Sequence, residues 1–358
     1  MNLKTFIRPA VLKKEAYSVS DYTCPVKLNQ NENPYFFPQE LMDEIHLIIQ
    51  RSHPNRYPTV FPDLLIKSLS EKLNISPDMI LVGHGSNELI YSALWAILSK
   101  GDSVLIPAPS FGLYESVAEL CEATVHRVIA DEETLLLDIE LFLREIKTHQ
   151  PKLIVLCNPN NPSSQRISVE DSIRIITAAP GLVWIDEAYI EFSENESLIN
   201  RLSEFRNVIL LRTFSKAYAL AGLRLGYIVS QPELTEEFRK TKVPFTVDEI
   251  SQSIALKILD HDDWVIAGIE KLMTEKSRLF ELLRAVPKVK VFESDTNFFI
   301  FKILDKSHKT VFKRLAEQGV LVRDVSSYPS MDGCLRVTIG TPRENDEFIQ
   351  KLMKILTT

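Results

Sequence analysis

A lysine that directly follows an apolar run is the first candidate for chemistry in this sequence. Val208 to Leu211 predict a short buried strand, and Lys216 comes just after it among small and apolar residues. Partial removal of a lysine from water lowers its pKa and frees the amine to attack a carbonyl group. A single lysine is more often a surface residue at the start of a helix, so its neighbours must decide between the two interpretations.

The residues around Lys216 are suited to hold a phosphate group. Thr213 and Ser215 carry hydroxyls, and Arg224 follows in the same segment, which is rich in Ala, Leu and Gly. Guanidinium groups bind phosphate oxygens through paired hydrogen bonds, and hydroxyls can add to them. A reactive amine beside a phosphate site suggests a lysine bonded to a phosphorylated aldehyde, namely pyridoxal phosphate.

Two further apolar runs end in polar side chains that such a cofactor would need. One ends at Asp186, about 30 residues before Lys216, a spacing that fits one helical crossover between parallel strands. Asp186 could keep the pyridine nitrogen protonated, and Tyr189 could donate to the phenolate oxygen. The other run ends at Asn158. Because open α/β sheets bind ligands at the carboxyl ends of their strands, we expect Asn158, Asp186 and Thr213 to lie close together.

Three motifs resemble those of the fold type I pyridoxal-phosphate-dependent aminotransferases: NPNNP at 158–162, IDEAY at 185–189 and TFSKAYALAGLRLGY at 213–227. In its details the chain is similar to the histidinol-phosphate aminotransferase branch of that family, over nearly its whole length. The other segments that carry the resemblance are LNQNENPY at 28–35, RYP at 56–58, GHGSNELI at 83–90, PSFGLY at 109–114, GVLVRD at 319–324 and CLRVTIGT at 334–341.

Further cofactor contacts are expected from the first half of the chain. The backbone amides of Gly85, Ser86 and Asn87, at the start of a predicted helix, form a natural site for an anion. The resemblance implies that Phe111 stacks on the pyridine ring, where many relatives carry tyrosine. It also implies that Tyr57 reaches the cofactor phosphate of a partner subunit, and therefore that the protein is a homodimer with shared active sites.

The substrate contacts are expected mainly from the last third of the chain. Apolar residues alternate around Arg336 and place it on the opposite face of its strand, where spacing alone would also allow a solvent-facing arginine. The resemblance makes Arg336 the anchor for a carboxylate, assisted by Asn158. It makes Arg323 the candidate for the substrate phosphate or for the side-chain carboxylate of glutamate. Tyr17 and Asn31 are expected near the phosphate end of the substrate.

The reaction implied by the resemblance is the exchange of an amino group between histidinol phosphate and 2-oxoglutarate, which gives imidazole-acetol phosphate and L-glutamate in histidine biosynthesis. Lys216 would act first as the Schiff-base nucleophile and then as general base and acid. Histidinol phosphate has no carboxylate, so the division of labour between Arg323 and Arg336 stays open. An aromatic amino-acid aminotransferase and a phosphothreonine-type decarboxylase on the same scaffold are alternatives. A non-catalytic ligand-responsive module is a further one, which the full set of cofactor residues argues against.

The composition sets limits on the class of protein. With 45% hydrophobic and 25% charged residues the 358-residue chain is typical of globular proteins. The net charge of −7 argues against a nucleic-acid partner. The four cysteines are widely spaced, which predicts no metal site and suits a reducing compartment. We find no secretory signal and no run near the roughly 18 apolar residues of a membrane span, so we expect a cytoplasmic protein without a membrane partner.

The order of the predicted elements indicates an α/β fold. Strands and helices alternate from about residue 79 to 230, which predicts a mostly parallel sheet with helices on both faces. Helices and short strands after that predict a smaller α+β domain. We expect an N-terminal arm and a helix joining the small domain over residues 1–45, a large pyridoxal-phosphate-binding domain over 46–246 and a small C-terminal domain over 247–358.

Overall fold

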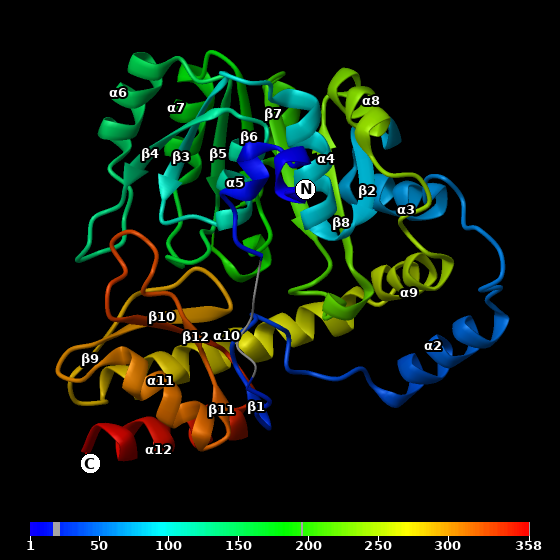
Figure 1. Cartoon of the computed structure of the whole chain (residues 1–358). Coiled ribbons are helices and arrows are strands. Elements are labelled where there is room, and N and C mark those ends of the chain that lie inside the picture. The colour runs from blue at the N-terminus through cyan, green and yellow to red at the C-terminus, as the bar shows by residue number, and fades with distance from the viewer. Residues whose placement is uncertain (17–21, 195, 358) are drawn as a thin grey trace.

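The computed structural model describes residues 1–16, 22–194 and 196–357, which are arranged around two main sheets (Figure 1). Tyr17, expected near the substrate, lies outside the described residues. The larger sheet has seven strands, in the order β2-β8-β7-β6-β5-β3-β4. Their bounds in this order are Ile80–His84, Leu225–Ser230, Val208–Thr213, Leu182–Asp186, Leu153–Cys157, Ser103–Ala108 and Thr124–Ile129.

The large sheet is mostly parallel, as expected. Strands β7, β6, β5, β3 and β4 pair in parallel, and β8 runs antiparallel to its neighbours β7 and β2. Side chains of a strand point alternately to its two faces, so the apolar runs supply two separate cores. On β6, for example, Val183 and Ile185 face one core and Trp184 faces the other. A doubly covered sheet explains why these strands are apolar without interruption.

Helices cover both faces of this sheet, which confirms the expected fold class. On one face lie α4 (Gly85–Ile97), α5 (Gly112–Leu120) and α8 (Pro232–Thr241). On the other lie α3 (Asp63–Leu73), α6 (Ile139–His149), α7 (Val169–Ala178) and α9 (Glu249–Leu259). Helix α4 begins directly after β2, and α5 begins a short turn after β3, so the starts of both helices lie at the edge of the sheet where ligands are expected.

The smaller part is built on a four-stranded antiparallel sheet in the order β12-β13-β10-β9. Its strands span Arg323–Asp324, Cys334–Thr338, Phe298–Ile303 and Val289–Val291. Helices α10 (Asp262–Arg284), α11 (His308–Glu317) and α12 (Pro342–Thr357) pack with it around a core of their own. Near the N-terminus, β1 (Val26–Lys27) pairs in parallel with β11 (Val320–Leu321), which brings the following segment, with its amide-rich motif, to this part of the molecule.

Helix α10 runs between the two parts (Figure 1). Its Val265 belongs to the core of the large sheet, whereas Leu272 and Leu279 belong to the core of the small one. Buried residues of α9 and of α2 (Gln39–Arg51) also belong to the large core. Helix α10 thus contributes to both parts, and the expected domain limits, 46–246 and 247–358, stay a prediction.

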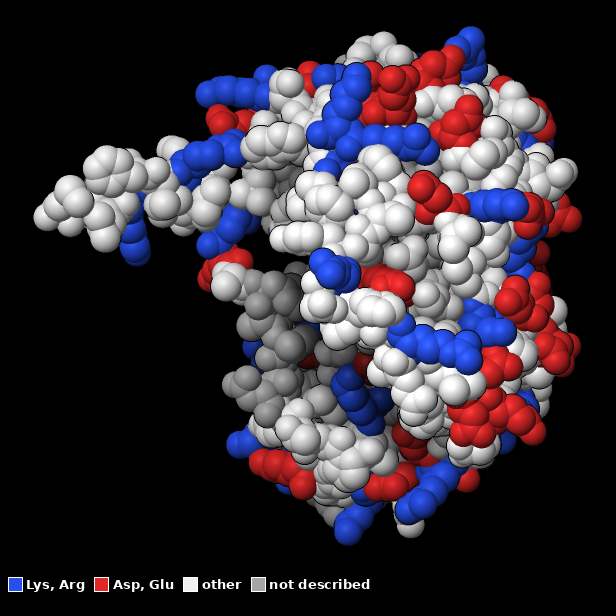
Figure 2. All heavy atoms as spheres, turned by 90° about the vertical axis from the view of Figure 1, so that its right-hand side faces the viewer, with Lys and Arg blue, Asp and Glu red and all other residues white. Residues whose placement is uncertain are grey.

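The first residues form an arm that projects from the body of the molecule (Figure 2). It contains η1 (Leu3–Phe6) and α1 (Pro9–Leu12), neither of which has a buried residue. Its anchor is Arg8, whose Nη2 donates to the carbonyl of Leu120 at 2.6 Å.

Over the face drawn in Figure 2, basic and acidic side chains are interspersed. In the three described stretches no helix has the length and apolar character needed to cross a membrane.

Candidate active site

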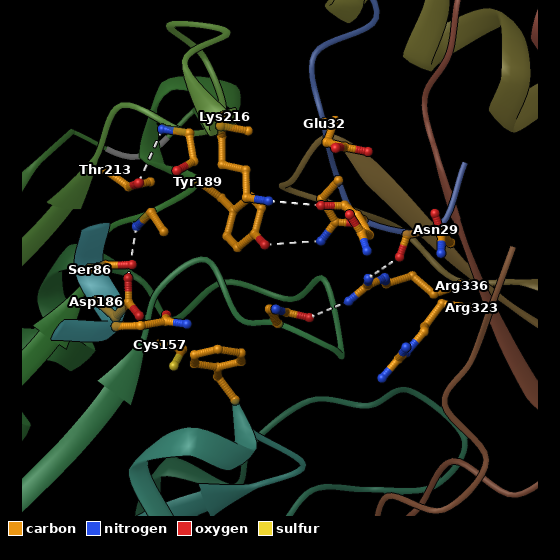
Figure 3. A pocket seen from close by; sticks show the side chains of 18 of the residues that line it. Asn29, Glu32, Ser86, Cys157, Asp186, Tyr189, Thr213, Lys216, Arg323 and Arg336 are labelled. Atoms are coloured by element: carbon orange, nitrogen blue, oxygen red, sulfur yellow. Dashed lines mark hydrogen bonds between the residues drawn. The ribbon is translucent and has the colours of Figure 1, made fainter. Parts of the chain in front are cut away.

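A cavity of about 490 Å³ lies where the carboxyl ends of the large sheet face the small sheet and the amide-rich segment (Figure 3). Its size fits a small organic ligand. Twelve of the residues expected in the site lie in its wall: Asn31, Ser86, Asn87, Phe111, Asp186, Tyr189, Thr213, Ser215, Lys216, Arg224, Arg323 and Arg336.

The amine of Lys216 lies in the middle of this cavity. Lys216 lies three residues after the end of β7, and its Nζ donates to the carbonyl of Gln30 at 2.8 Å. Burial, together with the positive charge of Arg336, lowers the pKa of Lys216 to about 7. A lysine with this pKa is largely neutral in weakly basic solution, which is the state in which an amine attacks a carbonyl.

Asp186 ends β6 on the floor of the cavity. One carboxylate oxygen, Oδ2, accepts a hydrogen bond from Tyr114 Oη at 2.8 Å, and Oδ1 accepts one from the backbone N–H of Ala188 at 3.0 Å. Burial raises the pKa of Asp186 to about 6. A buried carboxylate without a cationic partner costs free energy, so this position favours a ligand with a positively charged N–H group.

Tyr189 forms the wall between these two residues. Its hydroxyl accepts a hydrogen bond from Asn31 Nδ2 at 2.9 Å, and its ring lies 5.9 Å from Lys216 Nζ. Burial raises the pKa of Tyr189 to about 12, against the opposing effect of Arg336. The phenol therefore keeps its proton and can donate it to a ligand oxygen.

A cradle for an anion lies at the start of α4. No side chain caps this helix, so its first N–H groups are left for a ligand. The φ of +75° favours glycine at position 85, and Arg224 fills the space beside it, since a Cβ on Gly85 would lie 2.6 Å from its Nη2. Arg224 Nη1 donates to Ser215 Oγ at 3.3 Å, and the backbone N–H of Ser215 donates to Thr213 Oγ1 at 3.1 Å.

A second group of cations lies on the opposite wall, on the small sheet. Arg336 Nη1 donates to Asn161 Oδ1 at 2.7 Å, and its Nη2 donates to the carbonyl of Asn29 at 2.8 Å (Figure 3). Its guanidinium also lies 5.1 Å from the centre of the Phe298 ring. Arg323 is the direct cross-strand partner of Arg336, so both side chains lie on one face of the sheet.

Three expected residues are not brought into the cavity wall. Gly85 shapes the cradle behind Ser86. The side chain of Asn158 is engaged with Ile167, to whose carbonyl it donates and from whose N–H it accepts, both at 2.9 Å. Tyr57 is 85% exposed and contacts Phe245 at 5.2 Å between ring centres.

Sequence reasoning missed several residues of the wall. Asn161 belongs to the same NPNNP motif as Asn158, and only the path of the turn decides which amide faces the cavity. Asn29, Gln30 and Glu32 belong to the amide-rich segment, whose composition was the available signal. The remaining additions to the wall include Cys157, Pro159, Ala188, Val325 and Tyr328, for which the sequence offers no separate signal.

Comparisons with known proteins agree with this site. The family model described as aminotransferase class I and II matches residues 24–352. The chain belongs to this aminotransferase family. Its relatives include the histidinol-phosphate aminotransferase of Prosthecochloris aestuarii, 39% identical over 98% of this chain and 97% of the relative. That of Chlorobaculum tepidum is 37% identical over 98% of this chain and 100% of the relative.

Solved structures of aminotransferases share the fold. The histidinol-phosphate aminotransferase of Sinorhizobium meliloti, solved in complex with pyridoxal 5′-phosphate, superposes with a TM-score of 0.85 at 23% identity, over 93% of this chain and 91% of that one. The one from Clostridium acetobutylicum has the same TM-score and identity, over 93% and 99%. These comparisons confirm the resemblance seen in the sequence. The protein is an aminotransferase that depends on pyridoxal phosphate.

The donor set of the cavity fits this cofactor. The uncapped start of α4, the Ser215 hydroxyl and Arg224 match a phosphate dianion. The buried carboxylate of Asp186 matches a protonated pyridine nitrogen, and Lys216 has a lowered pKa, as an amine that condenses with an aldehyde requires. Phe111, on the cavity wall at the start of α5, offers an aromatic face.

Proposed function

We propose that this aminotransferase moves the amino group of histidinol phosphate to 2-oxoglutarate, giving imidazole-acetol phosphate and L-glutamate, as a step of histidine biosynthesis. Relatives that are 39% and 37% identical to this chain carry the name of this activity. The observation that supports it within this chain is the arginine pair on the small sheet, Arg323 and Arg336.

The arginine pair favours a ligand with more than one negative charge. Like charges directly opposite each other on neighbouring strands destabilise a sheet. Arg336 is 8% exposed, and its guanidinium donates to Asn161 Oδ1 and to the carbonyl of Asn29, which hold it beside Arg323. A phosphate dianion, or the two carboxylates of glutamate in turn, would offset this repulsion through charged hydrogen bonds. Both substrates of the proposed reaction meet that requirement.

The same proposal assigns the cofactor contacts. Ser86, Asn87, Thr213, Ser215 and Arg224 hold the phosphate of the cofactor, with Gly85 leaving room for the approach of Arg224. Asp186 keeps the proton on the ring nitrogen, Tyr189 donates to the ring oxygen and Phe111 covers one face of the ring. When bound, pyridoxal phosphate supplies the aldehyde that condenses with amines and the ring that takes up the electron pair released at the substrate Cα.

Lys216 moves the proton that the reaction requires. Once the incoming amine has displaced it, its neutral Nζ can accept the proton of the substrate Cα and later return it, because its pKa is lowered to about 7. Asn31 and Asn161 orient the groups on either side, through Tyr189 and Arg336 respectively. Assistance of Arg336 by Asn158, expected from the sequence, would act only through the backbone, since the Asn158 side chain is engaged with Ile167.

We further propose a homodimer in the cytoplasm. Tyr57, Val60, Leu64 and Phe245 are large and exposed, and Tyr57 contacts Phe245, which is the kind of surface that a second copy would cover. Tyr57 is then free to reach the cofactor phosphate of the partner subunit. The four cysteines are free thiols, which suits a reducing compartment.

The test is the visible absorbance of the cofactor-loaded protein during separate additions of three amines. Histidinol phosphate should bleach the band of the bound cofactor fastest, and 2-oxoglutarate should restore it. A faster response to phenylalanine would instead identify an aromatic amino-acid aminotransferase. Release of carbon dioxide from phosphothreonine without any keto acid would identify a decarboxylase.

A further inference from the structure

Asp186 is the last member of a buried chain of hydrogen bonds whose direction is fixed. Trp184 Nε1 donates to Tyr114 Oη at 2.8 Å, and Tyr114 Oη donates to Asp186 Oδ2 at 2.8 Å. The three side chains come from two elements, α5 and β6, and Trp184 and Asp186 share a face because they are two residues apart on β6. Trp184 and Tyr114 are fully buried, so no water competes for these groups.

The direction of the chain follows from the chemistry of its first member. An indole N–H can only donate, so the hydroxyl oxygen of Tyr114 must accept from Trp184. The single proton of that hydroxyl is then left for Asp186. The other carboxylate oxygen also meets a donor, the backbone N–H of Ala188. Both oxygens therefore accept hydrogen bonds from the protein, and acceptance at both oxygens favours the ionised carboxylate.

We propose that Tyr114 and Trp184 are positioning residues that keep Asp186 ionised and orient its free lone pairs toward the ring nitrogen of the cofactor. This inference rests on the proposed place of the cofactor. Tyr114 and Trp184 lie behind Asp186 and do not line the cavity, so they add a second set of residues to the contacts expected from the sequence. The sequence of α5 contains Tyr114 in the PSFGLY motif, where the sequence analysis gave a role to Phe111 alone.

The electrostatics of the buried carboxylate explain why such a chain is needed. Burial raises the pKa of Asp186, and the hydrogen bonds from Tyr114 and Ala188 act in the opposite direction. The titratable groups that face it are Tyr114 from α5, Cys157 from β5, and Glu187 and Tyr189 from its own segment. Tyr114 has a pKa well above its usual value because of burial, so it stays protonated and remains a donor.

The first experiment follows the protonation of Asp186 in the cofactor-free protein, by the infrared carbonyl band that disappears in Asp186→Asn. Tyr114→Phe should move the titration midpoint upward by about one pH unit, the size expected for the loss of one hydrogen bond to a charged group. Trp184→Phe should move it in the same direction by less, since Tyr114 keeps its proton but loses its fixed orientation. The matched control is Tyr227→Phe, which removes a buried phenol hydroxyl from the other side of the sheet and should leave the midpoint unchanged.

The second experiment measures cofactor affinity against pH in the same variants. If Tyr114 acts on the ionisation of Asp186, Tyr114→Phe weakens affinity about tenfold at pH 5.5 and hardly at all at pH 8, because only the ionised carboxylate pairs with a protonated ring. An equal loss at every pH would mean a merely structural role and would overturn the inference. An unchanged midpoint of the infrared titration in Tyr114→Phe would also overturn the inference. If Tyr114→Phe does not fold, an unchanged midpoint in Trp184→Phe would do the same.

The two proposals can fail separately. A wild-type protein that does not take up pyridoxal phosphate contradicts the proposed function, whereas the infrared titration tests the hydrogen-bond chain without any cofactor. A protein that loads the cofactor normally and shows no shift in Tyr114→Phe contradicts only the chain.

Discussion

The two walls of the cavity bind anions in different ways. The cofactor wall lies along the carboxyl edge of the large sheet, and groups within its segment 213–224 already contact each other: Arg224 with Ser215, and Ser215 with Thr213. The substrate wall is assembled from three distant segments, since Arg336 is held by Asn161 of the large part and by Asn29 near the N-terminus. The cofactor wall can form within the large part alone, and the substrate wall requires the two parts to dock.

This difference matches the ligands that each wall is proposed to hold. A cofactor that stays bound needs a rigid cradle, and the start of a helix beside a short loop provides one. Substrates change between the two half-reactions, and their wall is made of long arginine side chains on a small sheet. A site that depends on docking can couple substrate binding to the relative position of the two parts.

The largest expected effect is the loss of activity on replacing Lys216, which lies between the two walls. Lys216→Ala should abolish transamination, a loss of at least about 10⁴-fold, because no other described amine lies in the cavity to take its place. The measurement is turnover of histidinol phosphate with 2-oxoglutarate, together with circular dichroism to check the fold. Lys240→Ala, at an exposed lysine of α8, is the control and should retain full activity. Turnover by Lys216→Ala would contradict the mechanism.

The next effect separates the two arginines of the substrate wall. Arg336→Lys keeps the charge but cannot contact Asn161 and Asn29 together, so we expect kcat/KM to fall about 100-fold. Arg323→Lys, at the more exposed position, should cost about tenfold. Steady-state kinetics with each substrate varied in turn measure both. A larger loss at Arg323 for histidinol phosphate alone would assign the phosphate to Arg323 and leave Arg336 to the carboxylates.

The two walls also differ in how well they could be predicted from the sequence, because the substrate wall depends on contacts between distant segments. Much of the cofactor wall lies at the ends of strands, so the strand ends at Asp186 and Thr213 and the motif around Lys216 could be predicted from residue types and spacing. The cross-strand pairing of Arg323 with Arg336 depends on the register of two strands separated by a turn, which no local pattern encodes. The antiparallel β8 was not predicted either, because an apolar run does not reveal its direction.

The NPNNP motif shows the limit most clearly. Its amides are chemically identical, and the backbone turn decides that Asn158 points to Ile167 and Asn161 to Arg336. The hydrogen-bond chain behind Asp186 was missed for a similar reason. Tyr114 is an ordinary core residue by its spacing, and only tertiary packing places its hydroxyl between Trp184 and the carboxylate.

Replacing each of these two asparagines with alanine tests whether Asn161 serves the substrate wall and Asn158 serves stability. Asn161→Ala should lower kcat/KM about tenfold with little change in stability, because it removes one hydrogen bond to the guanidinium of Arg336. Asn158→Ala should instead lower the free energy of unfolding by about 2 kcal/mol, because it leaves the backbone of Ile167 without its buried partners. Kinetics and urea unfolding of both variants measure the two effects. A loss of kcat/KM in Asn158→Ala and a loss of stability in Asn161→Ala would mean that Asn158 turns toward the ligand when substrate binds.

The smallest expected effect concerns the free energy of unfolding of the cofactor-free protein. The pKa of Lys216 is lowered to about 7, below its value in the unfolded chain, so the unfolded state binds more protons between about pH 7 and 10. Stability should therefore rise with pH in that window, and Lys216→Met should remove this rise. Asp186 has the opposite sign: its raised pKa, about 6, means that the folded state binds more protons between about pH 4 and 6, so stability falls as pH rises there. Asp186→Asn should remove that fall.

Urea unfolding at a series of pH values measures both slopes. The contribution of the two groups to the free energy of unfolding is therefore lowest near neutral pH. There Asp186 is already ionised, and Lys216 is only beginning to lose its proton. A ligand that reacts with the amine and pairs with the carboxylate relieves both costs at once, so pyridoxal phosphate should stabilise the fold most in that range. Slopes that persist unchanged in Lys216→Met and Asp186→Asn would show that other groups set the pH dependence and that the cofactor wall is not strained in this way.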